Sequence, residues 1–172
     1  MGETVIQVSS LGKRIKGKTI LEDISFEINR GDCVALIGPN GAGKTVLMSC
    51  ILGDKKPSSG QVLIDGKAGK AKNKIAVLLQ ENTIPNSLKV SELIAFFQSI
   101  SDNPLTNQEV QDLLQFKEGQ YQQFADKLSG GQRRLLAFVL CLIDKPKILF
   151  LDEPTAGMDT STRQRFWEIV ND

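Results

Sequence analysis

The sequence predicts an α/β fold: a mixed sheet with antiparallel strands near the N-terminus and a helical insertion. Three observations support this fold. Residues 33–37 form an apolar run that leads into a glycine-rich loop and a helix. A second apolar run, Ile148–Leu151, ends in two acids, and helical spacing prevails between the two runs. The length of 172 residues suits one domain, and 41% apolar residues suffice for a core.

The individual elements follow from hydrophobic periodicity. Strands are expected at residues 4–9 and at 18–28, where even spacing of apolar residues leaves room for a bulge, and then at 33–37, 61–64 and 75–79. Helices are expected at 44–52, 90–100, 107–116, 121–127, 131–143 and 160–170. We therefore expect a single domain over 1–172, with a core at 1–84 and 145–172 and a helical subdomain at 85–144.

Composition excludes several kinds of chemistry. The chain has no histidine, which rules out Ser-His-Asp catalysis, Cys-His catalysis and His-ligated metal within these residues. The net charge of +1 argues against a broad nucleic-acid surface. Cys33, Cys50 and Cys141 lie in apolar stretches and are expected to be buried free thiols. The longest apolar run, 135–143, is too short to span a membrane and is expected in a buried helix.

The loop at residues 38–45 reads GPNGAGKT and matches the GxxxxGK[ST] phosphate-binding motif between a strand and a helix. Glycines let backbone amides converge on anionic oxygens, and the helix N-terminus adds the positive end of its dipole. Lys44 would reach the β- and γ-phosphates and Thr45 would bind Mg²⁺. A chance match is expected in roughly one such chain in two hundred. The predicted phosphate-binding set is Gly38, Pro39, Asn40, Gly41, Ala42, Gly43, Lys44, Thr45 and Val46.

Two acids, Asp152 and Glu153, follow the apolar strand Ile148–Leu151. They would lie at the carboxyl end of the strand, where parallel sheets bind ligands. Asp152 would hold Mg²⁺, and Glu153 would orient or deprotonate the attacking water. Many strands end in an acid, so the two acids alone predict little. They indicate a metal and water site only together with the phosphate loop.

A second glycine motif, LSGGQ at 128–132, precedes the helix at 131–143. A hydroxyl, two residues without Cβ and a helix N-terminus form another anion cradle. A serine N-cap with flexible glycines would also explain why a helix starts here. Arg133 and Arg134 come next and would either support the field at the γ-phosphate or lie on the surface.

These motifs together resemble the nucleotide-binding domain of an ATP-binding cassette (ABC) protein, a P-loop NTPase. Residues 38–45 are similar to its Walker A motif, 128–132 to its signature motif and 148–154 to its Walker B motif with catalytic glutamate. Gln80 fits the Q-loop position and 156–159 the D-loop. The motifs come in family order, and the resemblance covers essentially the whole chain.

The resemblance implies an ATPase that uses ATP and Mg²⁺ and works as a head-to-tail dimer. Each ATP would lie between the Walker A motif of one copy and the signature motif of a second nucleotide-binding domain, in a homodimer or a heterodimer. Lys44, Gln80 and Glu153 would be catalytic, and Thr45, Gln80 and Asp152 would hold the metal. The residues that act on the partner's ATP would be Ser129, Gly130, Gly131 and Gln132.

The resemblance also implies a transmembrane permease as partner, with the chain on the inner, cytoplasmic face of the membrane and no nucleic acid bound. The helical subdomain would receive the permease. Leu93, Ile94, Phe97 and Ile100 share one side of the helix at 90–100, and packing inside the subdomain is the simpler interpretation of that face. The compact cassette favours export over import. The permease would determine the substrate.

Two features depart from the family pattern. Ile15 stands near the place where the family has an aromatic residue that stacks on adenine. The switch histidine is also missing, because the family places it one helix and one strand after the D-loop, and the chain ends within that helix. A fragment that binds ATP with impaired hydrolysis is therefore one alternative. A soluble ABC ATPase that acts on ribosomes or DNA is another.

Overall fold

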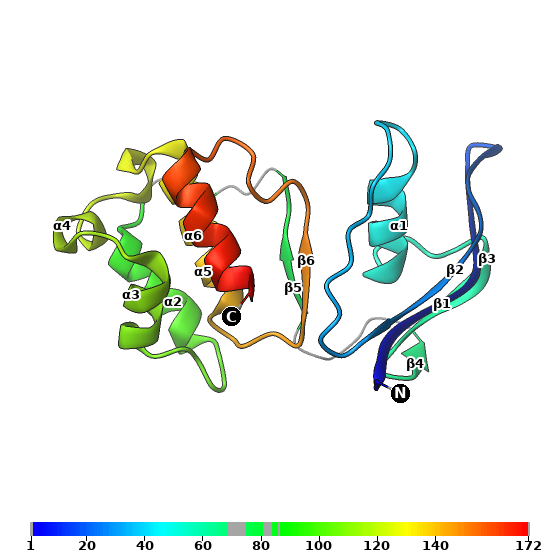
Figure 1. The fold of residues 1–172 in the computed structure, drawn as a ribbon, viewed down its shortest axis with the longest axis horizontal. Coiled ribbons are helices and arrows are strands. Elements are labelled where there is room, and N and C mark those ends of the chain that lie inside the picture. Colours follow the sequence, from blue (N-terminus) through cyan, green and yellow to red (C-terminus); the bar gives the residue numbers. More distant parts are fainter. Residues whose placement is uncertain (1, 69–74, 81–83, 86, 172) are drawn as a thin grey trace. The chain divides into compact units, whose positions relative to one another are not determined.

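We analysed a computed structural model that describes residues 2–68, 75–80, 84–85 and 87–171 (Figure 1). The chain forms two compact units, Met1–Lys72 and Asn73–Asp172, which we call the N-terminal and C-terminal units and describe in turn. The α/β fold class predicted from the sequence is confirmed, with antiparallel strands first and helices mostly later.

A four-stranded antiparallel sheet forms the N-terminal unit. Its strands are β1 (Thr4–Ile15), β2 (Lys18–Asn29), β3 (Ser59–Ile64) and β4 (Lys67–Ala68), in the order β2-β1-β3-β4. Lys16 and Gly17, both at positive φ, join β1 to β2 in a tight hairpin. The expected bulge is present as register shifts along this pair, and both Ser10 and Asp23 have positive φ. The sheet therefore bends where its register changes.

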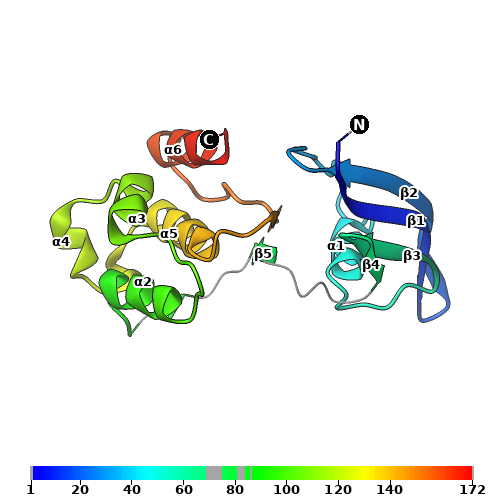
Figure 2. The same ribbon diagram turned by 90° about the horizontal axis from the view of Figure 1, so that it is seen from below.

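Helix α1 (Lys44–Ile51) covers one face of this sheet (Figure 2). Its inward residues Leu47, Cys50 and Ile51 are buried, as are Ile6, Val8, Leu11 and Ile64 of the sheet. Because burial of apolar surface is the main stabilising term, this contact determines where the helix and the loop before it lie on β1 and β2.

The strand expected at residues 33–37 is not present, so that prediction is wrong. Residues 32–39 have no regular secondary structure, and Val34 and Ile37 are 59% and 90% exposed. A buried parallel strand needs neighbours that accept and donate its backbone hydrogen bonds. Among the described residues no strand pairs with this segment, so its apolar composition alone does not produce a strand.

In the C-terminal unit, two parallel strands are covered by helices on one side (Figures 1 and 2). Strands β5 (Ile75–Leu78) and β6 (Ile148–Leu151) pair from Ile75↔Ile148 to Leu78↔Leu151. The helices are α2 (Val90–Ser99), α3 (Asn107–Leu114), α4 (Glu118–Tyr121), the 3₁₀ turn η1 (Ala125–Lys127), α5 (Gly130–Leu142) and α6 (Thr160–Asn171). The helices expected at 44–52, 90–100, 107–116, 131–143 and 160–170 are confirmed to within a few residues at their ends. The single helix expected at 121–127 is wrong, because the chain there forms the short α4, a bend at 122–123 and the separate turn η1.

Helix α5 runs through the core of this unit, which confirms the burial expected for 135–143. Leu136 and Val139 are fully buried, and the Phe138 ring lies 4.4 Å from the ring of Phe166 on α6. On α2, Leu93 and Ile94 are buried and Phe97 packs against the core, whereas Ile100 is 65% exposed. Most of the apolar face of α2 therefore packs inside the unit.

No helix within the described part of the chain is long and apolar enough to cross a bilayer.

Candidate functional site

The phosphate-loop residues form a turn between the irregular segment 32–39 and α1. The Ala42 N–H donates to the Pro39 carbonyl at 3.2 Å, and Gly41 and Gly43 have φ of 83° and 91°. Gly43 is the N-cap of α1 and has no side chain to occupy the first-turn amides. Amides at the start of the helix are therefore available to an anion, as the motif predicts.

Strand β2 lies directly behind this loop. A Cβ on Gly43 would be 2.9 Å from Leu21 Cδ2 and 3.2 Å from the Ile20 carbonyl oxygen. Only glycine fits there, both because of this contact and because of the positive φ. The loop is thus held by its close approach to β2, and a larger residue would push it away.

The Lys44 side chain folds back over the phosphate loop. Its Nζ donates to the carbonyl oxygens of Gly38 at 2.7 Å and Pro39 at 3.0 Å. The Thr45 side chain, one residue later, is exposed, and Val46 in the first turn of α1 is half-buried. An ammonium group, a free hydroxyl and a glycine cradle are the donors that a magnesium-bound triphosphate needs, so the residues present fit Mg-ATP.

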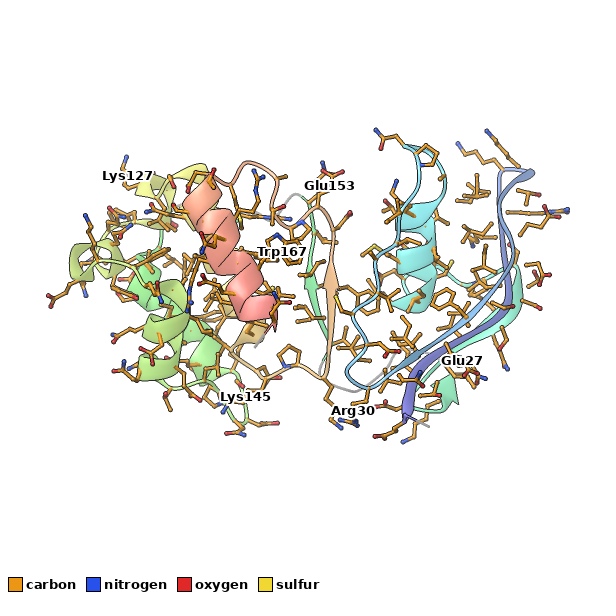
Figure 3. The ribbon with its side chains drawn as sticks, in the orientation of Figure 1. Glu27, Arg30, Lys127, Lys145, Glu153 and Trp167 are labelled. Carbon is orange, nitrogen blue, oxygen red and sulfur yellow. The ribbon has the colours of Figure 1, made fainter. Side chains whose placement is uncertain are left out.

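The two acids lie just beyond β6. The Asp152 N–H donates to the Leu78 carbonyl at 2.9 Å and so extends the pairing of β5 and β6 by one bond. Glu153 follows with φ of 45°, an unusual conformation for a non-glycine residue, and its side chain is exposed at the end of the strand (Figure 3). Gln80, also exposed, lies two residues beyond the end of β5.

Arg134 on α5 joins these two strand ends. Within the described part of the chain, its guanidinium donates to backbone carbonyl oxygens. Nε donates to Pro154 at 3.1 Å, Nη1 to Leu79 and, at 3.1 Å, to Gln80, and Nη2 to Asp152 at 2.9 Å and Glu153 at 3.2 Å. We call these six residues the Arg134 cluster. Burial lowers the pKa of the guanidinium, and the charge of Asp152 opposes that shift.

Of the two positions expected for Arg134, the surface position is wrong, because the residue is only 9% exposed. Sequence reasoning missed the Arg134 cluster. The sequence contained one indication that Arg134 is buried. It is four residues before Phe138, so the two share a face of the predicted helix.

The signature motif begins α5. Ser129 is the N-cap: its Oγ accepts from the Gln132 N–H at 3.2 Å, and the Gln132 side chain accepts from the Ser129 N–H at 3.2 Å. The serine-cap interpretation is therefore confirmed. Gly130 is exposed, and a Cβ there would meet nothing within 4 Å, whereas a Cβ on Gly131 would be 3.3 Å from Asp159 Oδ2. The signature helix thus approaches the D-loop closely.

Asp159 ends the D-loop and caps α6. Its carboxylate accepts from the Ser161 hydroxyl at 2.6 Å, the Thr162 N–H at 2.9 Å and the Thr162 hydroxyl at 2.8 Å. These hydrogen bonds, that from Ser161 first, hold the pKa of Asp159 well below its usual range. The D-loop therefore ends in a charged, fixed turn beside Gly131.

The predicted site residues fall into two sets. The C-terminal unit brings Gln80, Asp152 and Glu153 together around Arg134 and places the signature motif beside the D-loop. The residues of 38–46 belong to the N-terminal unit. Ile15, expected near adenine, is half-buried at the end of β1, where it pairs with Lys18.

A metal site made of protein ligands alone is not found: across the described ranges no three His, Cys, Asp or Glu side chains gather closely enough. The predicted set of Thr45, Gln80 and Asp152 contains one carboxylate. Such a set suits Mg²⁺, which keeps several waters and binds phosphate oxygens alongside one or two carboxylates.

The three cysteines are free, as expected. Cys50 is buried and Cys141 is half-buried, but the burial expected for Cys33 is wrong: it is exposed, because the strand expected at 33–37 does not form. Burial raises the pKa of the Cys50 and Cys141 thiols.

Comparison with known proteins agrees with the geometry. The sequence profile of the family described as "ABC transporter" matches residues 21–156. The chain is 34% identical to the Nod factor export ATP-binding protein I of Ralstonia nicotianae, over 95% of the chain and 54% of that protein. It is also 34% identical to the spermidine/putrescine import ATP-binding protein PotA of Protochlamydia amoebophila, over 90% of the chain and 44% of that protein.

A similar solved structure is that of a dimeric ATP-binding cassette in a post-hydrolysis state, bound to ADP and Pi. The TM-score is 0.78 at 20% identity, over 96% of the chain and 81% of the other protein, which shows the P-loop NTPase fold. The chain spans about half the length of the two curated relatives. Because the family profile covers most of the chain, the chain belongs to the ABC transporter family of ATP-binding proteins.

Proposed function

We propose that this chain is the ATP-binding and ATP-hydrolysing part of an ABC transporter, and that it drives transport through a membrane-embedded permease. ATP with Mg²⁺ is the cofactor of this family. The observation that supports the proposal most is the phosphate loop, in which glycine is required against β2 and Lys44 lies across the turn.

Each residue has a role that follows from its chemistry. The amides of residues 38–46 and the Lys44 ammonium would bind phosphate oxygens, and the Thr45 hydroxyl and the Asp152 carboxylate are the groups that would serve as metal ligands. Mg-ATP itself supplies the phosphoryl group that is transferred to water. Glu153 would accept a proton from that water, and Gln80 would help to orient the metal and the water. These roles rest on the family resemblance together with the placement of Gln80, Asp152 and Glu153 in one cluster.

We propose a head-to-tail pair, in which the signature motif of one copy binds the ATP held by the phosphate loop of the other. Ser129, Gly130, Gly131 and Gln132 would act in this way. Gly130 supports the proposal because it is exposed and nothing lies within 4 Å of the position of its absent Cβ, so a phosphate group can approach the helix N-terminus. The similar solved cassette is a dimer bound to ADP and Pi.

The first test is nucleotide binding by Lys44→Ala, measured by direct titration. We expect ATP binding to be lost, because the ammonium that neutralises the β- and γ-phosphates is removed. Lys67→Ala is the matched control: Lys67 is an exposed lysine on β4 of the same unit, and its replacement removes the same charge. Unchanged affinity in Lys44→Ala would contradict the proposed site.

The second test is ATP hydrolysis by Glu153→Gln. Removing a general base lowers the rate by about 10²–10⁴-fold. ATP affinity should stay close to that of the unchanged chain, because Glu153 would act on water and the phosphate loop would bind the nucleotide. A hydrolysis rate equal to that of the unchanged chain would show that Glu153 is not the base.

For direction, we propose export, as in the Nod factor export relative; import relatives match the chain at similar identity and over as much of its length. The chain would then lie on the cytoplasmic face of the membrane, bound to its permease. ATP-dependent accumulation of substrate in inside-out vesicles would support export, and uptake into right-side-out vesicles would contradict it. Co-purification with ribosomes or DNA in place of a membrane protein would refute the transport role.

A further inference from the structure

We propose that Arg134 is a positioning residue for ATP hydrolysis, which holds the segments after β5 and β6 in a fixed relation to the signature helix α5. This inference rests on the proposed function of Gln80 and Glu153. Among the described residues, the hydrogen bonds of Arg134 go to backbone carbonyl oxygens, so we assign it an action through Gln80 and Glu153 and none on the substrate.

The shape of the guanidinium explains why arginine is needed. It presents N–H groups in one plane over a wide arc, and here Nε, Nη1 and Nη2 all donate. Nη1 serves the end of β5 and Nη2 the end of β6, so one rigid group bridges two segments that are about 70 positions apart in the sequence. A lysine ammonium has three donors around one atom and cannot span both ends.

Burial makes these bonds strong. Arg134 is 9% exposed, so water does not replace a lost carbonyl contact easily. Hydrogen bonds to a charged donor are roughly twice as strong as those between neutral groups. These hydrogen bonds therefore hold the carbonyl groups beyond the ends of β5 and β6 in an orientation toward α5.

The orientation of Glu153 depends directly on this cluster. The carbonyl groups of Asp152, Glu153 and Pro154 all accept from Arg134, so the peptide planes on both sides of Glu153 are fixed. Glu153 has a φ of 45°, a conformation that L residues adopt at a cost and keep only when neighbours hold it. Without Arg134 the backbone can leave this conformation, and the carboxylate then points elsewhere.

The same helix carries the signature motif. Ser129 caps α5, and a Cβ on Gly131 would lie 3.3 Å from Asp159 Oδ2 of the D-loop; Arg134 follows about one turn later. A helix of 13 residues moves as a rigid body over such a short span. A shift at the start of α5 therefore changes the positions of the carbonyl groups beside Gln80 and Glu153.

The experiment compares Arg134→Lys and Arg134→Met with the unchanged chain. Arg134→Met keeps much of the volume but has no donor, and Arg134→Lys keeps the charge. We expect kcat to fall by at least tenfold in Arg134→Met and by less in Arg134→Lys, while KM and the ATP affinity change by less than about twofold. The reason is that the phosphate loop is built on other contacts.

Arg165→Gln is the matched control. Arg165 on α6 also donates to backbone carbonyls, those of Leu113 at 3.0 Å and Asp112, but these end α3 and lie outside the nucleotide motifs. We expect it to lower thermal stability without lowering kcat. If Arg165→Gln reduces kcat as much as Arg134→Met does, Arg134 has a structural role only and the proposal is wrong.

Hydrogen–deuterium exchange provides a readout that does not depend on activity. Exchange at the Asp152 and Ala156 amides, which donate to Leu78 and Glu153, should rise in Arg134→Met and stay unchanged in Arg165→Gln. Unchanged exchange, or a fall in ATP affinity that parallels the fall in kcat, would overturn the proposal. If the unchanged chain does not hydrolyse ATP, the proposed function fails, and exchange still tests the cluster.

Discussion

Replacing Gly43 with alanine should destabilise the N-terminal unit far more than the same change at Gly41. Both glycines have positive φ, 91° and 83°, and left-handed backbone costs an alanine about 1–2 kcal/mol. A Cβ at Gly41 meets nothing within 4 Å, so the cost of Gly41→Ala ends there. At Gly43 the Cβ would be 2.9 Å from Leu21 Cδ2 and 3.2 Å from the Ile20 carbonyl oxygen.

The backbone carbonyl determines the size of the difference. Leu21 can turn its terminal methyl group away, but the Ile20 carbonyl belongs to β2, which is paired with β1 and cannot move without breaking that pairing. Overpacking of this kind costs about 1–3 kcal/mol, so the total for Gly43→Ala is about 2–5 kcal/mol. With a urea m-value of about 2 kcal/mol/M, the unfolding midpoint falls by about 1 M or more.

The assay must report on the N-terminal unit alone. The single tryptophan and the single tyrosine, Trp167 and Tyr121, both belong to the C-terminal unit, so fluorescence follows that unit. Hydrogen exchange at the α1 amides reports on the N-terminal unit. One such amide is that of Leu47, which donates to the Gly43 carbonyl. We expect faster exchange in α1 and unchanged Trp167 fluorescence, without nucleotide present.

The comparison of the two variants decides the outcome. Equal destabilisation by Gly41→Ala and Gly43→Ala would show that the contact with β2 contributes nothing and that left-handed strain alone makes glycine necessary. A stable Gly43→Ala protein would refute the argument altogether.

Three further predictions concern other regions. Phe166→Ala should lose about 3–5 kcal/mol of stability, because the ring is fully buried 4.4 Å from Phe138; urea unfolding followed by Trp167 fluorescence measures this, and a loss under about 1 kcal/mol would contradict it. Asp159→Asn should be less stable than the unchanged chain at neutral pH. Since the folded pKa of Asp159 lies below the unfolded value of about 4, that difference should shrink as the pH falls below about 4, and a constant difference from about pH 7 to 2 would count against it. Cys33 should react first with a thiol reagent, as mass spectrometry of the labelled peptides can check, because the other two cysteines are shielded and have raised pKa values; equal labelling of all three would be inconsistent.

The elements that depend on local pattern were predictable from the sequence. Helices α2 and α5 carry clear helical spacing, and Ser129 with Gln132 forms the capping box that marks a helix start. The β1–β2 pair was also expected, but β1 continues to Ile15 because pairing with β2 extends it beyond its own apolar pattern. Tertiary pairing, which periodicity does not contain, decided where that strand ends.

The candidate site was predictable only where residue type carries the chemistry. The glycines, Lys44 and the two acids have a recognisable spacing, so they could be named from the sequence. Arg134 could not be assigned in that way, because its partners are backbone carbonyl groups, which every residue has. The strand expected at 33–37 is wrong for a different reason. Its composition fits a buried strand, but a strand forms only where a neighbouring strand pairs with it.

The exposed segment 33–37 has a consequence for handling the protein in solution. It contains no charge and no proline, its residues favour extended structure, and Ile37 is 90% exposed. Segments with this composition associate edge to edge with copies of themselves and initiate aggregation. The chain should therefore form oligomers as its concentration rises, and light scattering over a dilution series would detect them. Replacing Val34 with lysine should then delay their appearance, as charged residues do next to aggregation-prone strands.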